Sequence, residues 1–135
     1  MTDKKNPDIP ENEEGWREKL SKEQFEILRE KGTERPGTGD YLGKDDEGIY
    51  RCAGCGAKLF DSETKYDSEN SQWPSFYNAI KENVKFEEDT SHGMNRVEVL
   101  CRNCGGHLGH VFEDGPEPTG KRFCINSRAL DFDEK

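Results

Sequence analysis

The chain has 135 residues, of which 30% are hydrophobic and 36% charged, and its formal net charge at pH 7 is −9. This length suits one domain with a modest core, so we predict a single domain over residues 15–131, between a mobile tail at 1–14 and a C-terminal tail at 132–135. The acidic balance disfavours nucleic-acid binding, because neutralising phosphates requires clustered Lys and Arg. No apolar run is as long as a membrane span and no secretory signal is evident, so we expect a cytoplasmic protein without a membrane partner. We also expect it to be a monomer.

The first regular element predicted is a helix over residues 22–31. Ser21 followed three residues later by Gln24 has the form of a capping box, and the apolar stripe that begins there ends at Gly32. We expect the helix and the residues before it to pack on the main body. The apolar side chains that would do so are Trp16, Leu20, Phe25 and Leu28.

Two segments share one pattern, in which a strand-like run enters Cys-x-x-Cys-Gly and a second strand leaves it. The first holds Cys52 and Cys55, and the second holds Cys101 and Cys104. Four thiolates at this spacing are typical of a tetrahedral zinc site, and the long segment between the pairs means that the ion would join distant parts of a β domain. Because four thiolates fill the coordination sphere, this zinc would be structural and would not bind substrate.

A rival metal site would use the run Cys101-x-x-Cys104-x-x-His107-x-x-His110. It would leave the first Cys-x-x-Cys pair without a role. Four successive positions spaced three residues apart are also sterically awkward around one ion. If the four-cysteine site forms instead, both histidines are free for other work.

The fifth cysteine, Cys124, belongs to neither pair. The run Lys121-Arg-Phe-Cys-Ile-Asn-Ser is typical of a short strand, so Arg122, Cys124 and Asn126 would share one face while the apolar residues between them face the core. A nearby guanidinium lowers the pKa of a cysteine from its free value of about 8.5 and raises the thiolate fraction. On the residues alone, Cys124 is either an inert packed thiol or a nucleophile.

Two histidines follow the second knuckle beside flexible glycines. His107 and His110 could supply the acid or base that a nucleophilic thiol needs. Their spacing does not place both on one face of a straight strand, so either Gly109 bends the chain or only one histidine faces the thiol. Glu113 and Asp114 are candidates for orienting an imidazole or for pairing with the arginine.

Together these motifs resemble the signature of the B-type peptide methionine sulfoxide reductases. The likeness rests on the second Cys-x-x-Cys pair, on His-Leu-Gly-His-Val-Phe-x-Asp-Gly-Pro and on Arg-Phe-Cys-x-Asn-Ser. Trp73-Pro-Ser-Phe, Gly32-Thr-Glu and the first Cys-x-x-Cys pair extend it over roughly residues 16–131. The resemblance implies a mainly β fold of antiparallel sheets packed around a small core, with an N-terminal helix and two knuckles joined by one zinc.

The resemblance also implies reduction of the R epimer of methionine sulfoxide, free or within proteins. Cys124 matches the family's nucleophile, which attacks the sulfoxide sulfur and becomes a sulfenic acid. Without the resemblance, Trp73 would count as an ordinary core residue. The other implied site residues are His107, His110 and Asn126 around the sulfoxide oxygen, Arg122 beside the thiolate, Trp73 and Phe76 against the substrate, and Cys52, Cys55, Cys101 and Cys104 on zinc.

Two departures from the family pattern affect the expected chemistry. The run Ser68-Glu-Asn-Ser-Gln-Trp73 is one residue longer than in many relatives and lacks the cysteine that often resolves the sulfenic acid. We therefore expect a thioredoxin-like protein or a small-molecule thiol to regenerate Cys124. In Arg35-Pro-Gly-Thr-Gly, Gly37 stands where relatives commonly carry Phe, which removes one apolar contact near the site.

Two other functions stay open on the sequence. The chain could be a zinc-ribbon binding module in which Cys124 is incidental, and turnover of a sulfoxide substrate would exclude this as its main role. It could also be a Cys-x-x-Cys oxidoreductase, which requires pairs that bind no metal. Counting reactive thiols on the native protein distinguishes this oxidoreductase from the zinc-bound enzyme. The zinc-bound enzyme would show one reactive cysteine, and the oxidoreductase would show five.

Overall fold

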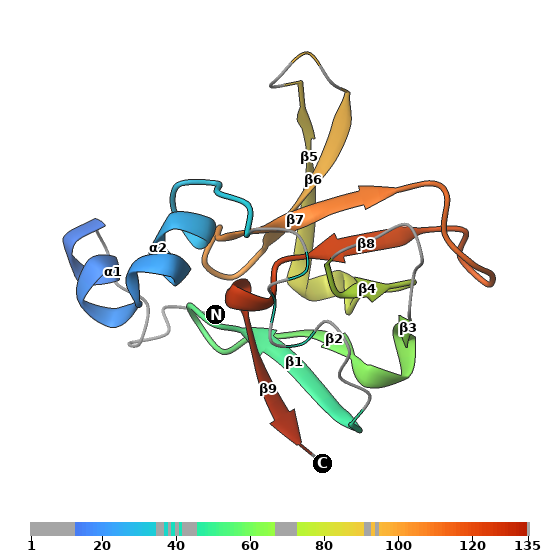
Figure 1. Cartoon of the computed structure of the whole chain (residues 1–135), viewed down its shortest axis with the longest axis horizontal. Helices are drawn as coiled ribbons and strands as arrows, with labels where there is room; N and C mark the ends of the chain where they lie inside the picture. The colour runs from blue at the N-terminus through green and yellow to red at the C-terminus, as the bar shows by residue number, and fades with distance from the viewer. Residues whose placement is uncertain are drawn as a thin grey trace.

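The computed structural model describes residues 13–34, 37, 39, 41, 46–66, 73–90, 93 and 95–134. Its fold is mainly β, with antiparallel sheets and few helices, as the sequence predicted (Figure 1). The predicted tail at 1–14 falls almost entirely outside the described residues, and so does the run from Ser68 to Gln72. The proposed domain bounds therefore stay a prediction.

The predicted helix is α2 (Lys22–Leu28), and its capping box is confirmed. The Ser21 hydroxyl accepts a hydrogen bond from the Gln24 amide at 3.1 Å, and the Gln24 side chain accepts one from the Ser21 amide at 3.0 Å. The helix ends earlier than predicted, because Lys31 adopts a left-handed conformation with φ of 57°. The chain then turns, and the Gly32 amide donates to the carbonyl of Glu26.

A second helix, α1 (Glu13–Lys19), precedes it and was not predicted from the sequence. The four apolar side chains expected to dock on the body are all buried, which confirms that expectation. Both helices have seven residues, and no helix in the described part of the chain is long and apolar enough to span a membrane.

A three-stranded antiparallel sheet has the order β2-β1-β9. It contains the first knuckle, which lies between β1 and β2. Residues 132–134, assigned to the C-terminal tail on the sequence, belong to β9, where Phe132 packs on Tyr50 with ring centroids 4.9 Å apart. The strands of this sheet are β1 (Gly48–Cys52), β2 (Lys58–Asp61) and β9 (Leu130–Glu134).

A six-stranded antiparallel sheet has the order β3-β4-β8-β7-β6-β5. The second knuckle joins β6 to β7, and β5 lies in a segment for which no element was predicted from the sequence. The hairpin of β5 and β6 projects from the body of the molecule (Figure 1). The strands are β3 (Lys65–Tyr66), β4 (Ser75–Phe76), β5 (Val84–Asp89), β6 (Arg96–Cys101), β7 (His107–Phe112) and β8 (Arg122–Ile125), with short 3₁₀ helices at Ser62–Thr64, Lys81–Asn83 and Ser127–Ala129.

The core between the sheets is built from aromatic rings. Phe60 stacks on Phe76 with ring centroids 4.4 Å apart, and Tyr50 meets Phe76 edge-on at 5.2 Å. Phe123 and Ile125 of β8 are fully buried, whereas Cys124 between them is partly exposed. The predicted alternation of β8 is therefore confirmed, and Cys124 lies on the face of the large sheet opposite the aromatic core.

Candidate active site and metal centre

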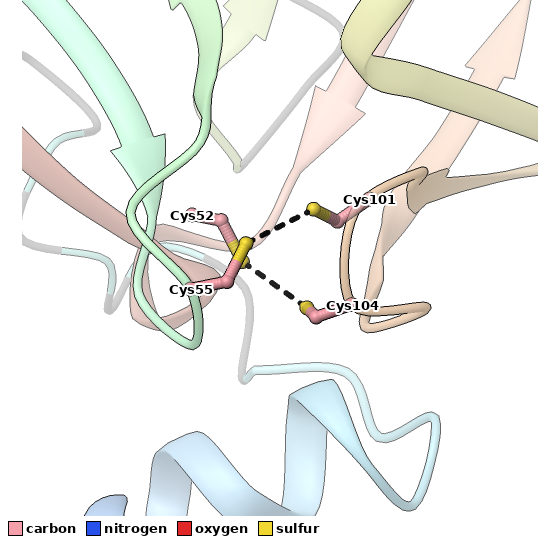
Figure 2. A group of neighbouring side chains, drawn as sticks. All are labelled: Cys52, Cys55, Cys101 and Cys104. Carbon is pink, nitrogen blue, oxygen red and sulfur yellow. Dashed lines mark hydrogen bonds between the residues drawn. The ribbon is translucent and has the colours of Figure 1, made fainter. Parts of the chain in front are cut away.

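The four paired cysteines meet in one cluster. Their sulfur atoms all lie within 4.8 Å of one another, with 3.7 Å between Cys52 and Cys104 and 3.5 Å between Cys55 and Cys101. Figure 2 shows the two knuckles facing each other, each contributing both of its sulfurs to the space between them. None of these cysteines forms a disulfide, so the cluster consists of four thiols from two distant hairpins.

Local sequence explains the shape of each knuckle. Gly56 and Gly105, which follow the second cysteine of each pair, have φ of 81° and 78°, a left-handed conformation that favours glycine. Their amides donate to the carbonyls of Cys52 and Cys101 at 2.8 Å. The Gly54 amide also donates to the sulfur of Cys52 at 3.3 Å, which supports a thiolate there.

The cluster fits a tetrahedral ion bound by sulfur. Four sulfurs about 2.3 Å from a central zinc would lie about 3.8 Å apart, close to the observed spacing. These four residues could therefore hold one zinc ion.

The rival metal site does not form. Among the described residues, the four cysteines are the one group of His, Cys, Asp and Glu whose ligand atoms converge closely enough for an ion. The imidazoles of His107 and His110 are instead hydrogen-bonded to Glu98 and Asp89.

The N-terminal helices cover the four-cysteine cluster. The Arg29 guanidinium donates to the carbonyl of Cys104 at 3.0 Å. A methyl group added at Gly106 would lie 2.9 Å from the side chain of Leu28, and one at Gly54 would lie 3.1 Å from the ring of Trp16. The helices therefore need glycine at both knuckles in order to pack this closely.

Cys124 lies at the centre of a row of residues that crosses the large sheet. On β8 it pairs with His110 of β7, and His110 pairs in turn with Glu98 of β6. The Arg122 guanidinium, on the same face of β8, approaches the Cys124 sulfur with its Nη1 at 3.5 Å. The predicted neighbours of the thiol are therefore brought together by strand pairing.

Arg122 is held in place from two sides. It donates two hydrogen bonds to the Asp114 carboxylate, at 2.9 and 3.1 Å, and its guanidinium lies 4.6 Å from the ring centre of Phe112. The hydrogen bonds to Asp114 raise the pKa of Arg122 and lower the pKa of Asp114, so both groups stay charged. Pairing with the arginine was one of the two roles predicted for Asp114. Glu113 pairs with Lys121 instead, and neither acid holds the imidazole of His107 or His110.

A β-bulge places both histidines on the face of Cys124. Leu100 pairs with His107 and Val99 pairs with Gly109, so β7 carries one extra residue, Leu108, at this point. The two imidazoles consequently face each other with ring centroids 5.4 Å apart. The chain therefore bends, which was one of the two alternatives that the sequence left open.

Gly109 is needed beside this bulge for a steric reason. A methyl group added there would lie 2.0 Å from the backbone carbonyl oxygen of Cys124. Glycine therefore lets β7 approach the backbone of β8 next to the thiol.

Each imidazole is held by a carboxylate that was not identified from the sequence. His107 Nδ1 lies 2.7 Å from Glu98 Oε2, and His110 Nε2 lies 2.7 Å from Asp89 Oδ2. Burial lowers the pKa of His107, and the hydrogen bond to Glu98 opposes this shift. The alternation of β6 could have identified Glu98, because it places this charged residue on the same face as the apolar Leu100.

A pocket of about 230 Å³ opens beside the thiol. It gathers five of the predicted site residues, whereas His107 and Phe76 are not among its lining residues. The lining consists of Thr33, Trp73, Arg96, Gly109, His110, Phe112, Arg122, Cys124 and Asn126. His107 lies behind it, 3% exposed, and Phe76 is fully buried in the aromatic core, so a direct contact of Phe76 with substrate stays a prediction.

Glu34 ties two pocket residues together. Its amide donates to the side-chain oxygen of Asn126 at 2.9 Å, and its carbonyl accepts from the indole of Trp73 at 3.0 Å. Its carboxylate accepts from the Arg128 amide at 3.1 Å. This role was not recognised from the sequence, although Glu34 belongs to the Gly32-Thr-Glu motif.

Of the departures from the family pattern, the segment before Trp73 lies outside the described residues, and Gly37 is exposed.

Comparison with known proteins gives one consistent result. The SelR domain family matches residues 20–134. A peptide methionine sulfoxide reductase MsrB of Methanosarcina barkeri is 54% identical over 125 residues, which cover 92% of this chain and 87% of the relative.

Two further relatives with the same name extend this likeness. The protein of Saccharophagus degradans is 59% identical over 120 residues, covering 88% of this chain and 89% of its own. The protein of Agrobacterium fabrum is 49% identical over 134 residues, covering 98% of both chains. With a four-cysteine cluster, a thiol beside an arginine and a match over nearly its whole length, this chain belongs to the SelR domain family of MsrB-type peptide methionine sulfoxide reductases.

Proposed function

We propose that this protein reduces the R epimer of methionine sulfoxide, free or within oxidised proteins, with Cys124 as the nucleophile. The observation that carries the proposal is the sulfur of Cys124, 3.5 Å from the Arg122 guanidinium in a pocket that also presents Trp73, His110 and Asn126. The names of the relatives support the same activity. A sulfoxide needs this combination of a thiol nucleophile, a proton source and an apolar wall for its methyl group.

The reaction transfers one oxygen atom from substrate to enzyme. The Cys124 thiolate attacks the sulfoxide sulfur and displaces its bonding electrons onto oxygen, which takes up a proton from an imidazolium of the site. The resulting hydroxyl group then moves to the Cys124 sulfur while the new bond between the two sulfurs breaks. One electron pair stays on the substrate sulfur, so methionine leaves and Cys124 becomes a sulfenic acid. Sulfur is reduced in the substrate and oxidised in the enzyme, so the two-electron exchange balances.

Each pocket residue has a distinct part in this step. Arg122 stabilises the thiolate by its charge, and Asp114 keeps the guanidinium in place. His110 and the Asn126 amide form the polar side towards the sulfoxide oxygen, with His107 behind them, and Trp73 forms the apolar side against the methyl group. Because the sulfur is a stereocentre, fixing its oxygen, its methyl group and the direction of attack selects one epimer.

Zinc has a structural part in the proposal. Cys52, Cys55, Cys101 and Cys104 would hold it, and it would cross-link two distant hairpins without entering the reaction. Once these four thiols bind zinc, none of them can resolve the sulfenic acid. Two equivalents of an external thiol, from a thioredoxin-like protein or a small molecule, would return Cys124 to the thiol with release of water and a disulfide. The enzyme would act as a monomer in a reducing compartment such as the cytoplasm, where the zinc thiols stay unoxidised.

The decisive experiment compares the two epimers of a methionine sulfoxide peptide with dithiothreitol as reductant. We expect turnover of the R epimer, none of the S epimer, and no turnover by Cys124→Ser. Mass spectrometry after one turnover without reductant should find one added oxygen on Cys124. Full activity of Cys124→Ser, or a disulfide between Cys124 and a knuckle cysteine, would contradict the proposal.

A further inference from the structure

Two carboxylates hold the two histidines of the site from behind. Glu98 Oε2 lies 2.7 Å from His107 Nδ1, and Asp89 Oδ2 lies 2.7 Å from His110 Nε2. Glu98 and His107 are 2% and 3% exposed, so this pair is fully removed from solvent. At these distances each imidazole donates an N–H to its carboxylate, because an ionised carboxylate only accepts hydrogen bonds.

Each carboxylate also contacts a cation, Glu98 through its second oxygen and Asp89 through the same oxygen that faces the imidazole. Lys31 Nζ lies 3.2 Å from Glu98 Oε1, and Arg96 Nη2 lies 3.6 Å from Asp89 Oδ2. The site therefore contains two chains of the same kind, in which a cation, a carboxylate and an imidazole follow one another. The cation balances the charge of the carboxylate, and the carboxylate fixes one nitrogen of the ring.

The two carboxylates hold opposite nitrogens. With its proton on Nδ1, a neutral His107 presents a bare Nε2, and this atom is buried and has no hydrogen-bond partner among the described residues. With its proton on Nε2, a neutral His110 presents a bare Nδ1. We propose that Glu98 and Asp89 are positioning residues that set opposite tautomers in the two histidines, so that His107 Nε2 and His110 Nδ1 are the atoms that carry and deliver the proton.

The geometry of Lys31 argues that this arrangement has a function beyond packing. Lys31 has a left-handed φ of 57°, where a side chain costs about 1 kcal/mol relative to glycine. Its ammonium nevertheless reaches the buried Glu98 carboxylate. A buried ion pair is also weak evidence of a purely stabilising role, because apolar residues of similar volume often serve stability as well or better.

The proposal rests on the proposed function, in which an imidazolium protonates the sulfoxide oxygen. The charged or titratable groups that face His107 are Glu98 on β6, Lys31 after α2 and His110 on β7 itself. A bare nitrogen held in a fixed direction can take up a proton and pass it to the substrate without a rotation of the ring.

The first test uses the wild-type protein and does not depend on activity. Nitrogen-15 NMR of the zinc-loaded enzyme at neutral pH distinguishes the two tautomers of each ring, and only three histidines, including His92, need assignment. We expect the proton of neutral His107 on Nδ1 and that of neutral His110 on Nε2. The same tautomer in both rings, or rapid exchange between tautomers, would overturn the proposal.

The second test separates positioning from stability. Glu98→Leu removes the acceptor and should reduce kcat by about tenfold or more with little change in KM, while zinc content stays at one ion per chain. Glu98→Gln keeps a neutral acceptor for Nδ1–H and should recover part of the lost kcat. Glu88→Leu and Glu88→Gln are matched controls, because Glu88 is exposed on the opposite face of the same sheet.

The outcomes distinguish this proposal from the proposed function. If Glu98→Leu folds and keeps the wild-type kcat and the Nδ1–H tautomer, the positioning role is wrong while R-sulfoxide reduction by Cys124 stands. If Glu98→Leu does not fold, the wild-type tautomers and the kcat of Glu98→Gln and Asp89→Asn decide. If Cys124→Ser keeps full activity, the proposed function fails whatever tautomers are found.

Discussion

The Arg122 guanidinium lies 3.5 Å from the sulfur of Cys124, and the Asp114 carboxylate fixes it there with two hydrogen bonds. The two partners are separated by one residue on β8, so strand periodicity alone puts them on one face. Asp114 comes from the loop after β7. Its hydrogen bonds to Arg122 therefore depend on how that loop folds back towards β8.

Replacing Arg122 should make the thiol less reactive. We expect Arg122→Met to reduce kcat/KM by about tenfold or more, because the thiolate loses its neighbouring positive charge. The pH dependence of Cys124 alkylation by iodoacetamide, measured on zinc-loaded protein, should shift to higher pH. Lys121→Met removes the same charge one residue earlier, where Lys121 pairs with Glu113, and should leave the alkylation profile unchanged. An unchanged profile in Arg122→Met would contradict the role assigned to the arginine.

Replacing Gly109 should disrupt the contact between β7 and β8 next to the thiol. A methyl group there would lie 2.0 Å from the carbonyl oxygen of Cys124, so we expect Gly109→Ala to destabilise the fold by about 1–3 kcal/mol and to reduce activity. Denaturant unfolding and kcat/KM measure the two effects. In Gly120→Ala the new methyl group meets nothing within 4 Å, and only the strain of φ at 72° remains. This control should lose about 1 kcal/mol and keep its activity.

Removing the metal should unfold the domain and not merely inactivate it. Two hairpins distant in sequence meet at the four sulfurs, so chelation or Cys52→Ser should remove a major part of the folding free energy. We expect loss of zinc, loss of the cooperative unfolding transition, and exposure of all five cysteines to a thiol reagent. Cys124→Ser should keep one zinc per chain and a Tm within a few degrees of the wild type. Retention of the cooperative transition by the metal-free protein would contradict the structural role.

Stability should depend on pH through His107. Burial lowers the pKa of His107 in the folded protein, whereas in the unfolded chain it titrates near its usual value of about 6.5. As pH falls through about 6.5, the unfolded state takes up a proton that the folded state does not, so the free energy of unfolding decreases. The effect is absent above the unfolded pKa and reaches its full size below the lowered folded pKa.

Denaturant unfolding at several pH values between 7 and 5.5 measures this dependence. His107→Asn should show a smaller decrease than the wild type, and His92→Asn should behave like the wild type. Equal slopes in all three proteins would show that His107 titrates alike in both states.

Local spacing in the sequence is enough to predict several features of this protein. Each Cys-x-x-Cys-Gly run makes its own turn, because glycine adopts the left-handed conformation that closes it. The capping box at Ser21 starts α2, and the period of two on β8 puts Arg122 and Cys124 together. The same reasoning did not predict β5 or α1, since short elements take much of their stability from tertiary packing.

The position of the two histidines relative to the thiol depends on tertiary structure. The extra residue Leu108 reverses the alternation of β7 and brings His107 and His110 to one face, and a bulge of this kind depends on pairing with β6. The carboxylates that hold the rings, Glu98 and Asp89, come from neighbouring strands. They are distant in sequence from the histidines, so the sequence does not reveal these contacts. Strand periodicity assigns a side chain to a face, whereas the partner across the sheet is set by register, which forms only when the strands pair.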